Sequence, residues 1–112
     1  MKNEERAAQA WPLLVFAAHT HKILGYTTLE RLTGLPARSW GRVLKLVANY
    51  CKRNHLPLLP AIVVSKSDGV PGGNYPGYQI SDEFGAFKER SRVFAFDWFS
   101  RKEVPNVEDF RK

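Results

Sequence analysis

The chain has 112 residues, of which 44% are hydrophobic and 12% aromatic, and this suits one domain with one hydrophobic core. Its 17 Lys and Arg residues exceed its 11 Asp and Glu residues, and the resulting charge of +6 favours a polyanionic partner. A membrane partner is disfavoured, because no long basic amphipathic segment stands apart from the predicted core. The single cysteine, Cys51, excludes an intramolecular disulfide framework.

The residue composition predicts neither a metal site nor a cofactor. The three histidines, His19, His21 and His55, do not stand in zinc-ligand spacing with the one cysteine. No secretory signal is visible, and the longest apolar run, residues 11–18, is too short to cross a bilayer. We therefore expect a cytoplasmic protein in a reducing environment.

The first predicted element is a helix over residues 4–22, with Asn3 as its N-cap. Pro12 either kinks this helix or begins a second one. His19 and His21 fall near its end, where we expect them to be exposed or to cap the helix.

Residues 25–53 then predict a short helix, a tight turn and a longer helix. Thr27 is the expected N-cap of the short helix, because Glu30 three residues later can complete a capping box. Gly34 and the following Leu-Pro break that helix and begin the next one. One face of the longer helix is apolar, with Trp40, Val43, Leu44, Val47 and Cys51 at helical spacing.

The opposite face of the longer helix is basic and polar, with Arg38, Arg42, Lys45, Asn49 and Arg53. This layout is typical of a helix-turn-helix whose second helix lies in a groove of DNA. An ordinary amphipathic helix with a solvated charged face fits the spacing equally well.

Residues 58–65 predict a strand, residues 66–69 a turn and residues 70–78 an irregular Gly- and Pro-rich loop, which together describe a wing. Ser81 is the expected cap of a last helix, and Val93–Phe99 favours helix over strand. That helix would cover the core with aromatic residues at near-heptad spacing, namely Phe84, Phe87, Phe94 and Trp98.

The predicted fold class is mainly α with a small β wing, a winged helix-turn-helix. One domain covers residues 1–102, and residues 103–112 form a polar tail that we expect to fray.

Four short segments follow one another in an order that points to a family. They are Gly25–Tyr26 followed by Thr27–Leu32, then Arg38–Gly41, Pro57–Val64 and Gly73–Gly77. Over residues 26–77 the chain resembles the C-terminal domain of the O6-alkylguanine-DNA alkyltransferases, and still more the alkyltransferase-like proteins that lack the acceptor cysteine. The resemblance covers a little under half of the chain.

The resemblance implies roles for three residues. Arg38 matches the arginine that enters the base stack where the damaged base leaves, and Tyr26 matches the tyrosine that crowds the phosphate beside the flipped nucleotide. Tyr75 lies in the loop, where it lines a base pocket or packs the wing. The alternatives are a surface arginine for Arg38 and an aromatic at the edge of the core for Tyr26.

The chain departs from the family at the reactive site. Ala61, Ile62 and Val63 follow Pro60 where the family has Cys-His-Arg, so that neither the alkyl acceptor nor its activating histidine is present. Cys51 cannot replace them, since it lies on the predicted second helix without an acid–base partner. We therefore predict no enzymatic activity and doubt a flipped-base pocket.

The first functional hypothesis is a non-enzymatic protein that binds double-stranded DNA, including modified or damaged bases if the resemblance to a DNA-repair family holds. The predicted DNA-binding residues are Tyr26, Thr27, Arg38, Ser39, Arg42, Lys45, Asn49, Lys52, Arg53 and Lys66. Among these, we expect Lys45, Lys52, Arg53 and Lys66 to bind phosphates and Arg38, Ser39 and Arg42 to reach into the groove.

Two alternatives come from other functional classes. The first is a protein-interaction module, such as a phage or plasmid-type inhibitor or adaptor on a former DNA-binding fold. Its partner, or a second copy of the chain, would dock on Phe94, Phe96, Trp98 and Phe99. The second is a hydrolytic site built from His55, Asp68, Asp82, Glu83 and Asp97, whose spacing matches no catalytic motif.

Overall fold

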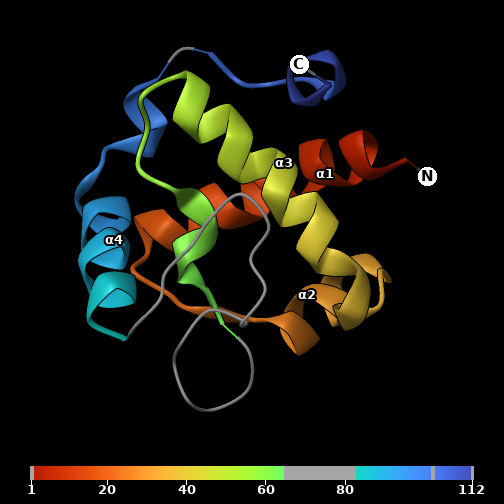
Figure 1. Cartoon of the computed structure of the whole chain (residues 1–112), viewed down its shortest axis with the longest axis horizontal. Helices are drawn as coiled ribbons and strands as arrows, with labels where there is room; N and C mark the ends of the chain where they lie inside the picture. Colours follow the sequence, from red (N-terminus) through yellow and green to blue (C-terminus); the bar gives the residue numbers. More distant parts are fainter. Residues whose placement is uncertain (1, 65–82, 102, 112) are drawn as a thin grey trace.

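The computed structural model describes residues 2–64, 83–101 and 103–111, without the side chains of Ala37 and of residues 83–87. This part of the chain is mainly helical (Figure 1), which confirms the mainly α class, and it includes a two-stranded parallel sheet. Its elements in chain order are α1 (Asn3–His19), β1 (Leu24–Gly25), α2 (Tyr26–Thr33), the 3-10 helix η1 (Ala37–Ser39), α3 (Trp40–Arg53), η2 (Leu59–Ile62), β2 (Val63–Val64), α4 (Glu83–Ala95), η3 (Trp98–Ser100) and η4 (Val107–Phe110).

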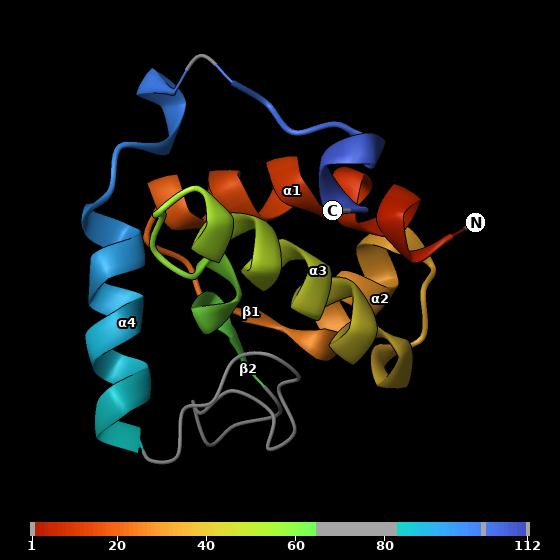
Figure 2. The same cartoon turned by 45° about the horizontal axis from the view of Figure 1, so that its top comes forward.

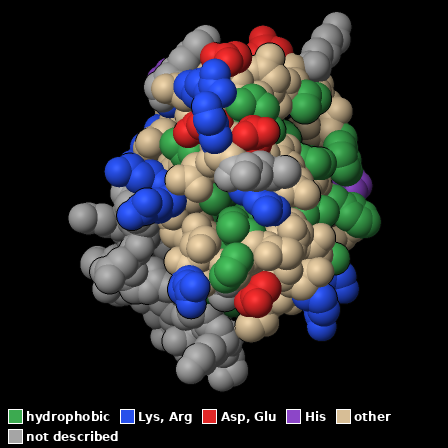
Figure 3. All heavy atoms as spheres, turned by 90° about the vertical axis from the view of Figure 1, so that its right-hand side faces the viewer, with side chains coloured by type: hydrophobic (Ala, Val, Ile, Leu, Met, Phe, Trp, Pro, Cys, Tyr) green, Lys and Arg blue, Asp and Glu red, His purple; other side chains and the backbone are tan. Residues whose placement is uncertain are grey.

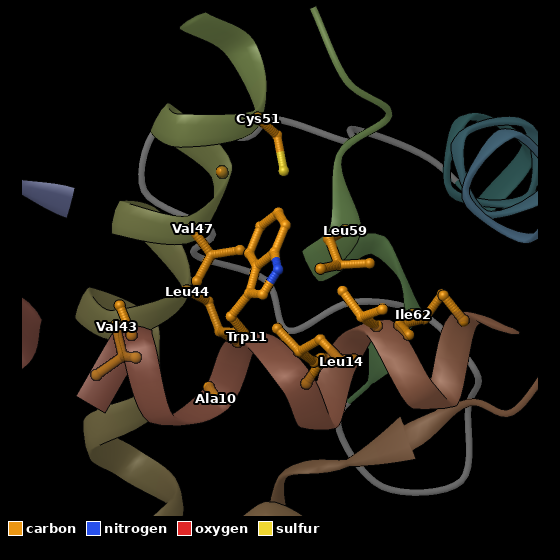
Figure 4. Packing of buried hydrophobic residues seen from close by; sticks show 14 of the residues in the cluster. Ala10, Trp11, Leu14, Val43, Leu44, Val47, Cys51, Leu59 and Ile62 are labelled. Atoms are coloured by element: carbon orange, nitrogen blue, oxygen red, sulfur yellow. The ribbon is translucent and has the colours of Figure 1, made fainter. Parts of the chain in front are cut away.

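The core lies between α1, α3 and η2. Trp11 of α1 stands between α3 and η2, close to Val47, Cys51 and Leu59 (Figure 4). The apolar face predicted for the longer helix is confirmed, because all five of its residues are buried, namely Trp40, Val43, Leu44, Val47 and Cys51. On α1, small side chains are buried and allow close packing of its neighbours, namely Ala7, Ala10, Ala17 and Ala18.

The first helix is single, and Pro12 lies within it with an exposed side chain. The prediction of Asn3 as N-cap is wrong, because Asn3 is already the first helical residue and Lys2 precedes it as the cap. The Glu5 carboxylate accepts a hydrogen bond from the Lys2 backbone N–H at 2.9 Å. The helix also ends at His19, earlier than residue 22, because His21 adopts a left-handed conformation with φ 57°.

A helix, a turn and a longer helix follow, as the sequence predicts. The cap assignment differs, because Gly25 is the N-cap of α2 and Thr27 lies inside the helix. Gly34, with φ 81°, ends α2 and donates its N–H to the Glu30 carbonyl at 2.7 Å. Trp40 Nε1 then donates to the Leu35 carbonyl at 3.2 Å, which fixes the turn to the beginning of α3.

The strand predicted over residues 58–65 is largely wrong. Half of it forms η2, where the Ala61 N–H donates to the Leu58 carbonyl at 2.9 Å and Pro60 has no N–H to donate to a neighbouring strand. Only β2 is a strand, and it pairs in parallel with β1, Leu24 opposite Val63 and Gly25 opposite Val64. The predicted turn and loop of the wing, residues 66–78, and Ser81 lie outside the described residues.

Helix α4 lies at one end of the α1–α3 pair (Figures 1 and 2). Two of its side chains bond to the backbone around η2: Glu89 Oε2 accepts from the Leu58 N–H at 2.8 Å, and buried Arg90 donates from Nε to the Ala61 carbonyl at 3.1 Å. The helix continues to Ala95 and η3 follows, so the predicted preference for helix over strand holds at Val93–Ala95.

The segment from Glu103 onward differs from the frayed tail that we expected. Its η4 turn buries Phe110, which is 1% exposed and whose ring centroid lies 5.5 Å from that of Tyr50 and 6.3 Å from that of Trp11. Asn106 caps this turn by accepting the Asp109 N–H at 3.1 Å. Within the described segments, helices that combine bilayer-spanning length with sufficient apolarity are absent.

Candidate nucleic-acid interface

The polar face of α3 is the strongest candidate for a binding surface. Arg42, Lys45 and Lys52 are exposed and Asn49 is half-buried, because the helical repeat places them opposite the buried apolar residues. Arg38 is also exposed, but it belongs to η1 rather than to α3. Among the described residues, Arg38, Arg42 and Lys45 form no ion pair with a carboxylate. No described carboxylate therefore competes with an external anion for these three side chains.

At the other end of α3, the C-terminal segment engages one of the predicted phosphate ligands. Arg53 Nη2 donates to the Asp109 carbonyl at 2.6 Å. A hollow of about 370 Å³ beside this bond is lined by Tyr50, Arg53, Asn54, Glu103, Val104 and Asp109. Two of these residues are acidic, so a phosphate that entered this C-terminal hollow would meet like charges. The structure thus favours the beginning of α3 over this C-terminal hollow as an anion-binding surface.

A second hollow, of about 340 Å³, lies at the beginning of α3 and is lined by Asn3, Arg38, Ser39 and Arg42. We call it the N-terminal hollow. Both Figure 1 and Figure 2 show α1 and α3 beginning on the same side of the molecule, which brings Asn3 to η1. Figure 3 faces this side and shows Lys and Arg side chains from its top to its bottom, with acidic side chains mostly in its upper half.

Asn3 is a site residue that the sequence did not assign. The sequence suggested only a helix cap for it, because nothing in the order of residues says that the beginning of α1 lies beside η1. Ser39 and the two arginines, by contrast, come from the predicted set.

The base pocket implied by the resemblance is only partly within the described residues. Tyr26 is half-buried at the first position of α2 and packs against the core, which agrees with an aromatic at the core edge. Thr27 is exposed one residue later. Lys66 and Tyr75 lie outside the described residues.

The described residues offer little reactive chemistry. Burial raises the pKa of Cys51 to about 12, and this outweighs a hydrogen bond with the Leu59 backbone and the positive charge of Arg101, which both lower it. The thiol therefore stays protonated at neutral pH and is a poor nucleophile. Across residues 2–64, 83–101 and 103–111, clusters of three or more His, Cys, Asp or Glu suited to a metal ion are absent.

Two residues of the hydrolytic alternative, His55 and Asp97, lie within the described structure. His55 is exposed in a left-handed turn after α3, and Asp97 caps η3 by accepting the Ser100 N–H at 3.3 Å. Asp68, Asp82 and the Glu83 side chain lie outside the described residues.

The aromatic C-terminal residues divide between core and surface. Trp98 is buried, Phe94 and Phe96 are half-buried, and Phe99 is 59% exposed. The Phe99 ring lies 4.6 Å from the His19 ring, centroid to centroid, and Phe16 is 56% exposed one turn earlier on α1. Most of this segment is thus core packing, with a smaller exposed patch.

The comparisons with known proteins give no family to set beside this geometry. No protein-family model, no curated protein and no solved structure matches the chain.

Proposed function

We propose that the protein is a non-enzymatic double-stranded DNA binder of the winged helix-turn-helix type. The observation that supports this most is the exposed cationic surface of η1 and α3, where Arg38, Arg42 and Lys45 form no ion pair within the described residues. The opposite face of α3 is fixed in the core, so the helix presents this surface rigidly. The formal charge of +6 favours the same kind of partner.

In this proposal α3 lies against the duplex. Lys45 and Lys52 bind phosphates and set the affinity, while groups at the beginning of α3 approach the bases. The resemblance to the alkyltransferase-like proteins adds a preference for modified bases, with Arg38 and Tyr26 as the residues that sense them. It also adds a wing with Lys66 and Tyr75.

The experiment is direct binding to a labelled duplex, plain or with one O6-alkylguanine, over a salt series from about 50 to 200 mM. We expect the logarithm of the binding constant to fall linearly with the logarithm of salt, by about 0.9 for each phosphate contact. Lys45→Gln should make that slope shallower by about 0.9, the value for one phosphate contact.

The matched control is Lys22→Gln, which removes the same charge from an exposed position beyond the end of α1. Equal effects of the two substitutions would contradict the assignment of α3 as the docking surface. No binding of the native protein to either duplex at low salt would overturn the DNA proposal. Equal affinity for the two duplexes would remove the preference for modified bases alone.

As a second candidate function, we propose self-association through the patch of Phe16, His19 and Phe99. Its support is the exposure of Phe16 and Phe99, with the Phe99 ring against that of His19. Sedimentation at rising concentration should show a dimer that Phe99→Ser abolishes, with Val104→Ser, at another exposed apolar site, as the control. A monomer at all concentrations would exclude this candidate.

A further inference from the structure

We propose that the N-terminal hollow, lined by Asn3, Arg38, Ser39 and Arg42, binds one phosphate group of the DNA backbone. This inference rests on the proposed function and deepens it. It replaces one part of that proposal, because Arg38, Ser39 and Arg42 bind a phosphate here instead of the bases, and Arg38 is then not the residue that senses modified bases. It also adds Asn3 of α1 to the interface.

The chemistry of the four lining residues suits a phosphate. Two guanidinium groups, a hydroxyl and an amide can all donate hydrogen bonds, and none of the four carries a negative charge. Arginine is well suited to such a site because its planar group can donate two parallel hydrogen bonds to phosphate oxygens. The Ser39 side chain makes no capping hydrogen bond to α3, although Ser39 is its N-cap residue.

The nearest acidic residues in the sequence of α1 have other contacts. The Glu4 carboxylate lies 4.0 Å from Arg111 Nε, and the Glu5 carboxylate accepts from the Lys2 backbone. Neither residue lines the N-terminal hollow. The hollow therefore keeps the positive charge of its two arginines.

Gly41 provides a separate observation. It lies in the first turn of α3 between Ser39 and Arg42, and a Cβ built there would meet none of the described neighbours within 4 Å. Glycine weakens a helix by about 1 kcal/mol relative to alanine, and the described part of the fold offers no steric reason for it at this position. A glycine here leaves the α3 backbone open to close approach by a ligand, and a sugar-phosphate chain passing the hollow would make such an approach.

A phosphate bound in the N-terminal hollow would contact both α1 and α3. Asn3 and Arg42 lie far apart in the sequence and line the same hollow because α1 packs along α3. A phosphate held between them would fix the orientation of both helices on the duplex. Such a contact sets register and affinity without reading sequence.

The test is Asn3→Asp, which places a carboxylate in the N-terminal hollow. An acidic side chain in the first turn of a helix is favourable for the fold, so the free energy of unfolding should stay the same or rise. Binding should weaken about tenfold on every duplex, because one phosphate contact is lost and a like charge is introduced. The plot of the logarithm of the binding constant against the logarithm of the salt concentration should become shallower, its slope changing by about 0.9.

The matched control is Gln9→Glu, which adds the same charge at an exposed position on α1 outside the hollow. Gln9 Oε1 accepts a hydrogen bond from Arg6 Nη1 at 3.2 Å, which glutamate can also accept. We expect less than a twofold change in affinity for this variant, since solvent and salt screen an exposed charge that lies outside the binding site.

Each outcome has one meaning. Equal weakening by both substitutions, or by neither, would overturn the phosphate site while leaving DNA binding itself intact. Weakening by Asn3→Asp on one duplex sequence alone would also overturn it, because a phosphate site is indifferent to sequence. Failure of the native protein to bind any duplex would instead overturn the proposed function.

Discussion

The burial of the Cys51 thiol predicts how much folding stability the protein loses at high pH. The thiol is fully buried between α3 and the Trp11 ring (Figure 4), and burial raises its pKa from 9.0 to about 12. In the unfolded chain the thiol ionises near pH 9, whereas in the folded protein it stays protonated. The unfolded state therefore loses its proton first, and stability is lost as pH rises from about 9 toward 12.

Below the folded pKa, the magnitude depends on how far the pH lies above the unfolded pKa of 9.0. One pH unit above the unfolded value corresponds to about 1 kcal/mol, so the Cys51 contribution should fall by about that much between pH 8 and pH 10. Tyrosine and lysine residues titrate in the same range, so the quantity to measure is the difference between the native protein and Cys51→Ala. Urea unfolding of both proteins at pH 8, 9 and 10, with a reductant present, gives that difference.

Two results would refute the reasoning. A native-minus-variant difference that stays constant from pH 8 to pH 10 would show that the thiol ionises equally in the folded and unfolded states. Rapid reaction of the native protein with a thiol reagent at pH 8, without prior unfolding, would show that Cys51 is not enclosed by the core as the structure has it.

The other predictions concern the C-terminal segment and the helix ends. Phe110→Ala should lower the free energy of unfolding by about 3 kcal/mol, because it leaves a cavity beside Trp11 and Tyr50, and urea unfolding will measure the loss. Gly41→Ala should raise the melting temperature, since it adds up to about 1 kcal/mol of helix stability in open space. His55→Gly should stabilise the protein by up to about 1 kcal/mol, because His55 holds a left-handed φ of 57° that glycine adopts without strain, and calorimetry will detect the shift.

Each of these predictions has a result that contradicts it. An unchanged midpoint for Phe110→Ala would mean that the η4 turn is not anchored in the core. A lower melting temperature for Gly41→Ala would reveal a steric need for glycine in α3. A loss of stability in His55→Gly would mean that the imidazole contributes more than the backbone strain costs.

The parts of the fold that could be predicted are those that a local pattern determines. The apolar face of α3 follows from the spacing of large side chains such as Val43 and Val47, and the end of α2 follows from Gly34, because a left-handed residue at a helix end favours glycine. The helix around Pro12 stayed ambiguous in the sequence because local rules permit either a kink or a break.

The parts that could not be predicted depend on contacts between distant segments. The pairing of Leu24 with Val63 joins two strands of two residues each, and so short a run has no detectable alternation. Phe110 is one aromatic in a polar segment, so its burial depends on the space that Trp11 and Tyr50 leave open. The N-terminal hollow was missed for the same reason, since Asn3 joins it only through the packing of α1 on α3.

The place of Phe110 in the core also has a consequence for synthesis of the chain. When α1 to α3 have emerged from the ribosome, Trp11 and Tyr50 still lack the ring that covers them, because residue 110 is added much later. The proposed docking helix would then be formed but incompletely supported on its inner side. The core around Trp11 and Tyr50 is therefore complete only after residue 110 has been added and has left the ribosome, which is later than the formation of α1 and α3.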